Sequence, residues 1–347
     1  MCNSTLLQNG ILTIVLFGGI KMYPIKFENL YYEKVWGGRD FAMFRDNLPE
    51  GNIGESWDVA CHKNGTSVVA NGEFKGKRLD ELIKENGEDI IGTKISKKWF
   101  PLLVKLINAK ESLSVQVHPD DKYAREIEGE MGKTEVWYVV DAKEGANLIV
   151  GTKAGSTKDQ IKKAIETGNL EPYMNKVYIK QGDVYFIKSG LIHAIGPGVI
   201  IAEIQQNSDT TYRVYDYGRG RELHINKALD VMNLSLTGEK STGIKVTRQG
   251  FDKTYLCLCK EFSLEKYNIK VQAEEESDKE RFYIFTVVNG QGEIKFNEGT
   301  EKLKKGDSIL IPAVLGKYTL CGSMTLLKSY VPDIDKVDAE ILSQIKK

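Results

Sequence analysis

Two similar stretches, KQGDVYFIKS at residues 180–189 and KKGDSILIPA at residues 304–313, decide the fold. Each begins with Lys-x-Gly-Asp and continues as a mostly apolar run. Glycine permits a positive φ and aspartate can accept a hydrogen bond from the nearby backbone, so both stretches predict a tight turn that leads into a strand. Two copies of one unit indicate two related β-barrel domains.

Short apolar runs between turn residues extend this pattern over most of the chain, which contains 33 Gly and 8 Pro. Runs rich in Val, Ile, Tyr and Phe at this spacing are typical of a sandwich or barrel. The expected strands are Val136–Val140, Leu148–Val150, Val184–Ile187, Val199–Ile204, Tyr283–Val288 and Ser308–Ile311. The expected helices are Leu79–Ile91, Ser156–Thr167 with Ser156 as its N-cap, and the short Asn226–Met232. We therefore expect a mostly β protein with a few inserted helices.

The domain boundaries follow from shifts in composition. Residues 232–249 are polar and rich in turn residues, which is typical of a linker. We expect a first domain at 22–240, a second at 250–347, and a leader at 1–21. The apolar run 11–20 has about half the length of a membrane-spanning helix. It has no Lys or Arg before it and no A-x-A-like cleavage site after it, so we favour a non-native or poorly ordered leader over a signal peptide.

Composition excludes several classes of protein. The chain has 347 residues, of which 41% are hydrophobic and 28% charged, which argues against disorder, collagen or a membrane bundle. Lys and Arg number 48, as do Asp and Glu, so the net charge of zero gives no strong drive toward nucleic acid or an anionic membrane. Five scattered cysteines favour a reducing compartment, and we expect a cytoplasmic protein.

A metal site is suggested by polar residues that alternate along one strand. Residues 114–119 read SVQVHP, so Ser114, Gln116 and His118 share one face, which we expect to line a polar cavity. Glu135 opens the next strand, and His193 follows the first Gly-Asp strand. Gln, His, Glu and His form a ligand set suited to Zn²⁺, or less well to Mn²⁺, Fe²⁺ or Co²⁺. The alternative is that each histidine is a hydrogen-bonded core or surface residue.

Two arginines could add a phosphate site. Arg213 lies among strand-like residues, and Arg219 follows at an even spacing of six. Two guanidinium groups that reach one cavity would suit a phosphate. Alternatively, they pair with surface carboxylates such as Asp216 or Glu222.

With these residues, the chain resembles type I mannose-6-phosphate isomerase (phosphomannose isomerase) in its short bacterial form, a member of the cupin superfamily. The resemblance covers about residues 22–335. It is carried by PLLVK at 101–105, SVQVHP at 114–119, GKTE at 132–135, and the run from GLIH at 190–193 to Arg213. The S-x-Q-x-H-P stretch followed by K-x-E is specific to that family, whereas a lone Gly-Asp turn is not.

The resemblance implies two cupin-type jelly-roll β-barrels with a small helical insertion. The catalytic, metal-binding barrel would be the domain at 22–240, and the domain at 250–347 would be metal-free. One Zn²⁺ per chain is expected. The implied residues are the metal ligands Gln116, His118, Glu135 and His193; the catalytic Arg213, Lys133 and Lys105; and the substrate-binding Ser114 and Arg219.

The implied activity is the interconversion of mannose 6-phosphate and fructose 6-phosphate through a cis-enediol. The base is left open: Lys133 or Lys105 could serve if burial beside the metal and Arg213 lowers its pKa, and a metal-bound water is an equal candidate. The chain departs from longer relatives at Gly132, where they carry a His before the K-x-E lysine. This departure puts in doubt any mechanism that needs that histidine.

Other functions remain open at this point. A sugar-phosphate-binding cupin without turnover would not need Arg213 together with Lys133. A metal cupin that isomerises another phosphosugar and an iron dioxygenase are further alternatives. We expect a small phosphosugar as the ligand, no nucleic-acid or membrane partner, and a monomer or weak homo-oligomer.

Overall fold

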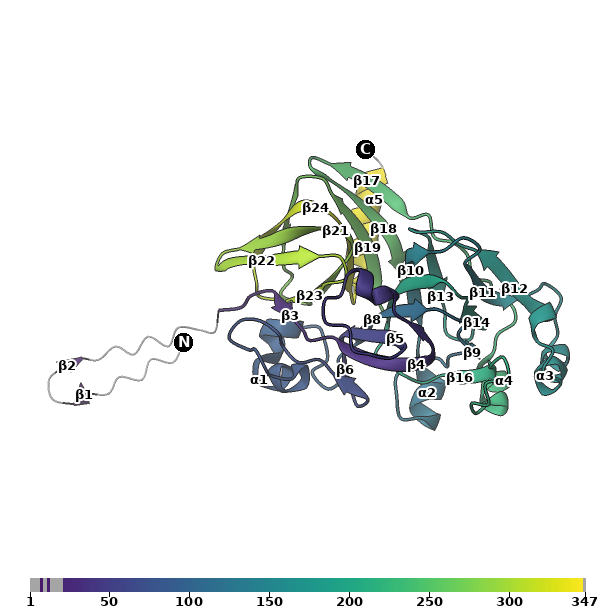
Figure 1. Ribbon diagram of the computed structural model, residues 1–347. Coiled ribbons are helices and arrows are strands. Elements are labelled where there is room, and N and C mark those ends of the chain that lie inside the picture. The colour runs from purple at the N-terminus through teal and green to yellow at the C-terminus, as the bar shows by residue number, and fades with distance from the viewer. Residues whose placement is uncertain (1–6, 9–10, 13–20, 346–347) are drawn as a thin grey trace.

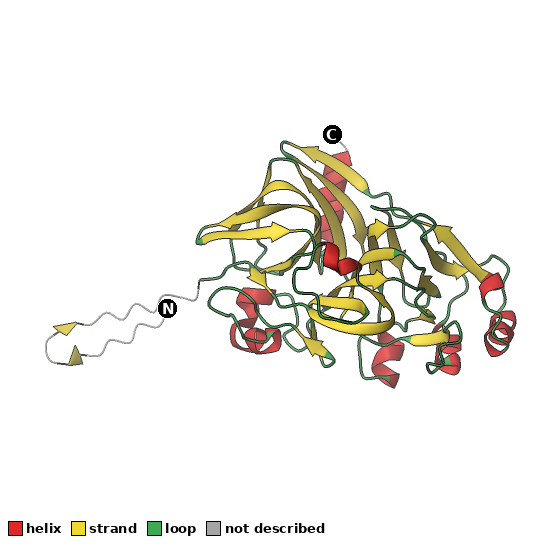
Figure 2. Cartoon of the chain, in the orientation of Figure 1, coloured by secondary structure: helices red, strands yellow, loops and turns green. Residues whose placement is uncertain are grey.

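The computed structural model describes residues 7–8, 11–12 and 21–345, and strands dominate it (Figures 1 and 2). The expectation of a mostly β protein is confirmed. Most of the expected leader, at 1–6, 9–10 and 13–20, lies outside the described residues. Within it, β1 (Leu7–Gln8) and β2 (Ile11–Leu12) form a two-stranded antiparallel pair.

The first unit of the fold consists of two antiparallel sheets. The six-stranded sheet has the order β13-β10-β15-β8-β5-β4, and the five-stranded sheet has the order β12-β11-β14-β9-β16. The six strands are β4 (Leu30–Gly38), β5 (Ile53–Val59), β8 (Leu102–Ala109), β10 (Glu135–Ala142), β13 (Val184–Ile187) and β15 (Val199–Gln206). The five are β9 (Val115–Val117), β11 (Asn147–Thr152), β12 (Met174–Tyr178), β14 (His193–Ile195) and β16 (Tyr212–Tyr215). A buried cluster that joins Ile107 and Trp137 of the first sheet to Leu148 and Ile195 of the second lies between them.

The second unit is a single nine-stranded sheet. Its strands after residue 240 are β17 (Ile244–Arg248), β18 (Phe251–Leu258), β19 (Ser263–Ile269), β20 (Gln272–Glu276), β21 (Tyr283–Phe296), β22 (Gly299–Lys304), β23 (Ser308–Ile311) and β24 (Lys317–Tyr330). The ninth strand, β3 (Ile25–Lys26), comes from the start of the described domain and pairs with β23. Strand β17 pairs with β18, so only part of the expected linker at 232–249 is a connection.

The repeated Lys-x-Gly-Asp turns have the same geometry in both units, as the sequence predicts. Gly182 and Gly306 have φ values of 87° and 91°, a region that favours glycine. The carboxylates of Asp183 and Asp307 accept hydrogen bonds from the backbone nitrogens three residues earlier, at 3.2 and 3.1 Å. Each turn therefore starts its strand, β13 or β23, in the same way.

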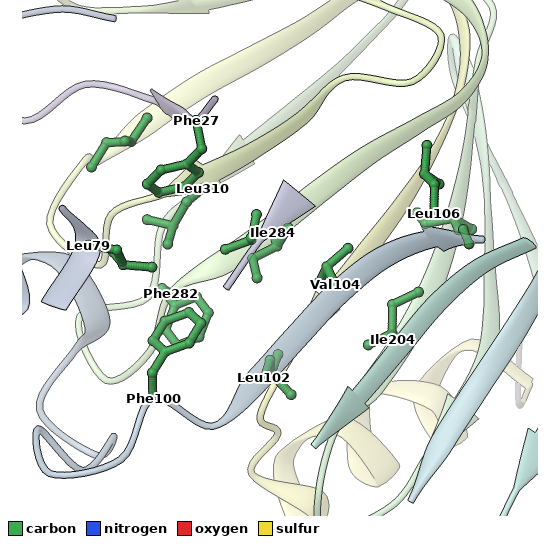
Figure 3. Close-up of a cluster of buried hydrophobic side chains, with 14 of the residues drawn as sticks. Phe27, Leu79, Phe100, Leu102, Val104, Leu106, Ile204, Phe282, Ile284 and Leu310 are labelled. Atoms are coloured by element: carbon green, nitrogen blue, oxygen red, sulfur yellow. The ribbon is translucent and has the colours of Figure 1, made fainter. Parts of the chain in front are cut away.

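The two units share a large apolar core. Its members come from the outer face of the six-stranded sheet, from the second unit and from α1 (Leu79–Ile91). Figure 3 labels Phe27, Leu79, Phe100, Leu102, Val104, Leu106, Ile204, Phe282, Ile284 and Leu310 among them. The rings of Phe100 and Phe282 stack across the boundary with centroids 5.0 Å apart. Because this cluster is continuous, the units pack as one hydrophobic core.

The helices are peripheral, and all three expected ones are present. They are α1, α2 (Asp121–Ile127), α3 (Lys158–Glu166), α4 (Ile225–Val231) and α5 (Ile334–Ile345), with 3-10 turns at Asp40–Met43 and Glu171–Tyr173. The expected N-cap Ser156 is wrong, because the Thr157 hydroxyl accepts the hydrogen bond from Gln160 N. Helices α2 and α5 were not expected. Among the described residues, we find no helix of the length and apolarity that a membrane crossing requires.

Candidate active site

The alternation of β9 divides its side chains as the sequence predicts. Val115 and Val117 pack in the cluster that lies under helices α3 and α4, while Ser114 and Gln116 line a cavity between the sheets. Strand β9 lies between β14 and β16, and its register places Gln116 opposite both His193 and Arg213. Polar groups from three strands therefore share one row of the sheet.

Two of the expected ligands approach Glu135 from the opposing sheet. The Nε2 atoms of His118 and His193 each lie 3.6 Å from one Glu135 carboxylate oxygen and 3.2 Å from each other. The Gln116 amide nitrogen lies 3.4 Å from His193 Nε2, so this side chain reaches the same point. All three ionisable residues are at most 1% exposed. The structure thus brings the four expected ligands together at one buried point.

The imidazoles are set up to present lone pairs toward this point. His118 Nδ1 donates to the Thr210 carbonyl at 2.9 Å, and His193 Nδ1 donates to the Leu191 carbonyl at 2.8 Å, which leaves each Nε2 as an acceptor. Burial lowers the pKa of His193 to about 4 and holds the pKa of His118 well below its usual value. Both rings are therefore neutral at pH 7, as metal binding requires.

The surroundings of the Glu135 carboxylate show that a cation fits at this point. Both of its carboxylate oxygens are buried and lack a hydrogen-bond partner among the described residues. The nearest cation is Lys133 Nζ, at 3.3 Å. An unsatisfied buried carboxylate is costly, and it faces two neutral imidazole nitrogens and an amide. This donor set fits a divalent cation such as Zn²⁺.

The cavity next to this point is small and strongly charged, with a volume of about 270 Å³. Five cationic and three anionic side chains line it. They are Lys34, Lys105, Lys133, Arg213 and Arg221, and Glu55, Glu203 and Asp209. A lining with more cations than anions suits a small polar ligand that carries negative charge.

Lys105 lies on the wall of the cavity formed by the six-stranded sheet. Its register neighbours on β5 and β15 are Trp57 and Glu203. Lys105 Nζ lies 3.6 Å from Glu203, 3.9 Å from Glu55 and 4.9 Å from the centre of a Trp57 ring. The ammonium group is therefore fixed by two carboxylates and an aromatic face while it borders the cavity.

The charges around Lys133 keep it protonated. Burial alone would lower its pKa, but the negative charges of Glu135 and Glu203 outweigh burial and raise it. This direction is opposite to the lowered pKa that a lysine base needs. Burial, followed by the charge of Glu135, raises the pKa of Glu203. Of these two groups, the one whose pKa is shifted toward neutral pH is thus the Glu203 carboxyl and not the Lys133 amine.

Arg213 connects the cavity to Ser114 and Gln116 of the neighbouring strand. Its Nε donates to Ser114 Oγ at 3.2 Å, and one of its terminal nitrogens donates to the Glu222 carbonyl at 2.9 Å. Ser114 Oγ in turn donates to Gln116 Oε1 at 3.3 Å. Burial and the neighbouring Arg221 lower the pKa of Arg213, but a guanidinium group stays charged at neutral pH.

Arg219 does not line the cavity with Arg213, as the even spacing of these residues predicts. Its guanidinium group donates to Asp216 at 2.8 Å and to the Ser112 carbonyl at 2.9 Å, while Arg221 lines the cavity instead. Strand β16 ends at Tyr215, so the alternation does not continue to residue 219. The alternative pairing of Arg219 with Asp216 is the one that the structure contains.

Gly132 has no room for a side chain. A Cβ atom there would lie 2.5 Å from Asp121 N and 2.6 Å from the Asp120 carbonyl carbon. The Gly132 nitrogen also donates to the Asp121 carboxylate at 2.9 Å. The histidine of longer relatives therefore cannot be accommodated here without moving the start of α2, and the site must work without it.

Two acidic residues of the cavity, Glu203 and Asp209, are not among the site residues expected from the sequence. Glu203 is the single carboxylate in the mostly apolar strand VIIAEIQQ. A lone charged residue in a buried strand is rare, so it could have marked Glu203 as a candidate site residue. Asp209 lies in the loop after β15, where no periodicity marks its direction.

Comparisons with protein families match both units. A family model described as "Phosphomannose isomerase type I, catalytic domain" matches residues 25–152. A second model, "Mannose-6-phosphate isomerase, cupin domain", matches residues 252–331. The expected cupin fold is thereby confirmed for a chain whose second unit repeats the turn of the first.

Individual relatives match over nearly their whole length. The chain is 38% identical over 315 residues to mannose-6-phosphate isomerase ManA of Bacillus subtilis, covering 89% of this chain and 99% of that protein. It is 38% identical over 314 residues to mannose-6-phosphate isomerase of Streptococcus mutans, covering 88% and 98%.

Solved structures give the same result. The crystal structure of the mannose 6-phosphate isomerase from Bacillus subtilis matches with a TM-score of 0.83 at 39% identity, covering 89% of this chain and 99% of that one. A variant of phosphomannose isomerase from Salmonella typhimurium matches with a TM-score of 0.74 at 14% identity, covering 89% and 99%, which is a likeness of fold.

Proposed function

Because the chain belongs to the type I mannose-6-phosphate isomerase family, we propose that it interconverts mannose 6-phosphate and fructose 6-phosphate. It is an aldose–ketose isomerase, and the reaction moves a proton between C2 and C1 through a cis-enediol. The observation that carries the proposal is the buried Glu135 carboxylate. Among the described residues it has no hydrogen-bond partner, and it faces two neutral imidazoles beside a cationic cavity.

We infer one Zn²⁺ per chain, held by Gln116, His118, Glu135 and His193. The support is the donor set, in which two imidazole nitrogens, a carboxylate and an amide converge at a buried point. When bound, a divalent cation would polarise the sugar carbonyl and stabilise negative charge as the C–H proton leaves.

The side chains of the cavity divide the remaining work. Arg213 stabilises the enediolate or holds the phosphate, and Ser114 orients Arg213 through its hydroxyl. Lys133 and Lys105, both buried, stabilise negative charge on the sugar oxygens. Glu203 is the group best suited to carry the proton, because burial raises its pKa toward the working pH.

The same proposal extends to the setting in which the enzyme works. We infer a cytoplasmic enzyme that is a monomer or weak homo-oligomer, with a phosphosugar as its ligand and neither nucleic acid nor membrane as a partner. The balanced net charge supports the absence of a nucleic-acid or anionic-membrane partner, and the five scattered cysteines support a reducing compartment. Light scattering of the purified protein measures the oligomeric state.

A coupled assay with and without a chelator tests the function. We expect production of fructose 6-phosphate from mannose 6-phosphate, its loss after chelation, and its return on addition of Zn²⁺. Full activity in protein shown by elemental analysis to be metal-free would refute the metal role. Binding of mannose 6-phosphate without turnover would leave a sugar-phosphate-binding protein, and faster turnover of glucose 6-phosphate would show a different substrate.

A further inference from the structure

The loop between β15 and β16, residues 207–211, touches both the proposed metal site and the cavity. The carbonyl of Thr210 accepts the hydrogen bond from His118 Nδ1 at 2.9 Å. Its neighbours Asp209 and Thr211 line the cavity. The position of this loop therefore sets the orientation of one imidazole and the shape of one cavity wall.

Glu130, in the segment after α2, holds this loop by two hydroxyl groups. Its Oε2 accepts a hydrogen bond from Thr210 Oγ at 3.1 Å and another from Ser208 Oγ at 3.4 Å. Ser208 Oγ also accepts from Thr210 N at 3.3 Å, and Ser208 is fully buried. Within the described part of the chain, Glu130 is the one side chain that bonds both hydroxyls.

The other oxygen of Glu130 is anchored on the β6–β7 hairpin (Cys61–His62 and Gly65–Thr66). Oε1 lies 2.5 Å from Lys63 Nζ and 3.5 Å from His62 Nε2. In the turn of the same hairpin, Asn64 donates to the Asp209 carboxylate at 2.9 Å. Glu130 thus links the β6–β7 hairpin to the loop that contacts His118, and its side chain is only 11% exposed.

We propose that Glu130 is a positioning residue for the metal centre. It holds residues 207–211 so that the Thr210 carbonyl keeps the His118 ring in place, with the Nε2 lone pair directed at Glu135. The proposal rests on the proposed function, because it takes His118 as a ligand. Partners that orient a metal-bound imidazole change metal affinity by about 10- to 100-fold. Since Glu130 acts through one intervening residue, we expect about tenfold.

The first test is a double-mutant cycle between Glu130 and the Thr210 hydroxyl. Glu130→Ala and Thr210→Val each remove the hydrogen bond between them, and Thr210→Val leaves the carbonyl that His118 uses. The probes are Zn²⁺ and Co²⁺ alone, titrated against a chromophoric chelator, together with the d–d spectrum of the Co²⁺ form. Each variant should raise the dissociation constant about tenfold, and the double variant should be no weaker than either single one.

Conservative and distant variants serve as controls. Thr210→Ser keeps the hydroxyl and should bind Zn²⁺ like the wild type. Glu126→Ala removes an exposed glutamate of α2 that has no part in this link. It should leave the affinity within about twofold of the wild type.

Three results would overturn the proposal. They are wild-type affinity in Thr210→Val and Glu130→Ala, additive losses in the double variant, and a lower melting temperature of the metal-free protein with unchanged affinity. His118→Ala separates this failure from failure of the proposed function. If His118→Ala itself binds Zn²⁺ normally, the ligand set is wrong; if it loses Zn²⁺ while the Glu130 variant does not, only the positioning role is wrong.

Discussion

Arg213 is held in the cavity by Ser114 on one side and by the Glu222 carbonyl on the other. We expect Arg213→Ala to keep the fold and the metal but to lower kcat by about 10²- to 10³-fold, as is typical when a group that stabilises developing charge is removed. Arg213→Lys should recover only part of the lost kcat, because an ammonium group cannot make both hydrogen bonds. Steady-state kinetics with metal analysis measures both, and normal isomerisation by Arg213→Ala would show that the assignment is wrong.

Glu55 should make stability depend on pH in the acid range. Burial would raise its pKa, but the charges of Lys105 and Lys34 lower it to about 2, from an ordinary value of 4.5. A depressed carboxyl pKa stabilises the folded state above about pH 4.5, and this stabilisation is lost as the pH falls toward 2. We expect Glu55→Gln to lower the free energy of unfolding by about 2 kcal/mol at pH 7.

Urea unfolding at several pH values measures this effect. The gap between Glu55→Gln and the wild type should be full at pH 7 and smaller at pH 3.5. Glu50→Gln, at an exposed position in the loop before β5, is the matched control and should change little at either pH. A gap that stays constant down to pH 3.5 would contradict the pKa assignment.

At the scale of single residues, sequence could predict the side chains that alternate on a strand. Ser114, Gln116 and His118 are spaced by two along and beside β9, so it was predictable that they lie on one face of the strand. Arg219 was placed by the same rule beyond the end of β16, where it no longer applies. Asp209 depends on how a loop is held by Asn64 and Glu130, and such long-range contacts leave no local pattern.

The two Gly-Asp turns give a matched pair of predictions about elements. Gly182→Ala should cost about 1 kcal/mol of stability, because φ is positive but the space around a new Cβ is open. Gly306→Ala should cost about 2 kcal/mol or more, because its Cβ would also lie 2.5 Å from the Phe44 ring. Thermal unfolding of the two variants measures this, and equal losses would show that Phe44 moves aside freely.

Elements with their own local signal were predictable, and those that depend on a partner were not. Helix α1 begins and ends at Leu79 and Ile91, as its apolar spacing indicates. Strand β3 has two residues and exists because β23 offers it an edge. Strand β17 lies in a polar stretch that reads as a linker, and its pairing with β18 makes it a strand.

At the scale of the whole molecule, the shared core should make the two units unfold together. Phe282 of the second unit is 1% exposed and stacks on Phe100 of the first, so Phe282→Ala should cost about 3 to 5 kcal/mol. All four tryptophans lie before residue 140, in the first unit and its connections. If the two units unfold together, tryptophan fluorescence of the first unit should therefore show the loss of stability caused by Phe282→Ala in urea unfolding.

Val271→Ala, at a position of the second unit that is 65% exposed, is the control for this experiment and should leave the fluorescence midpoint nearly unchanged. If Phe282→Ala also leaves it unchanged while circular dichroism shows the second unit melting earlier, the units unfold independently. That result would contradict a single cooperative core.

The pairing of Lys26 with Ile309 has a consequence for how the protein is made. A ribosome that adds about 5 to 20 residues per second needs roughly 15 to 60 s to progress from one partner to the other. During that interval the β3 segment has left the exit tunnel, and its partner strand β23 has not yet been synthesised. The nascent polypeptide must therefore keep this short segment available, and the nine-stranded sheet closes only after β23 has been synthesised.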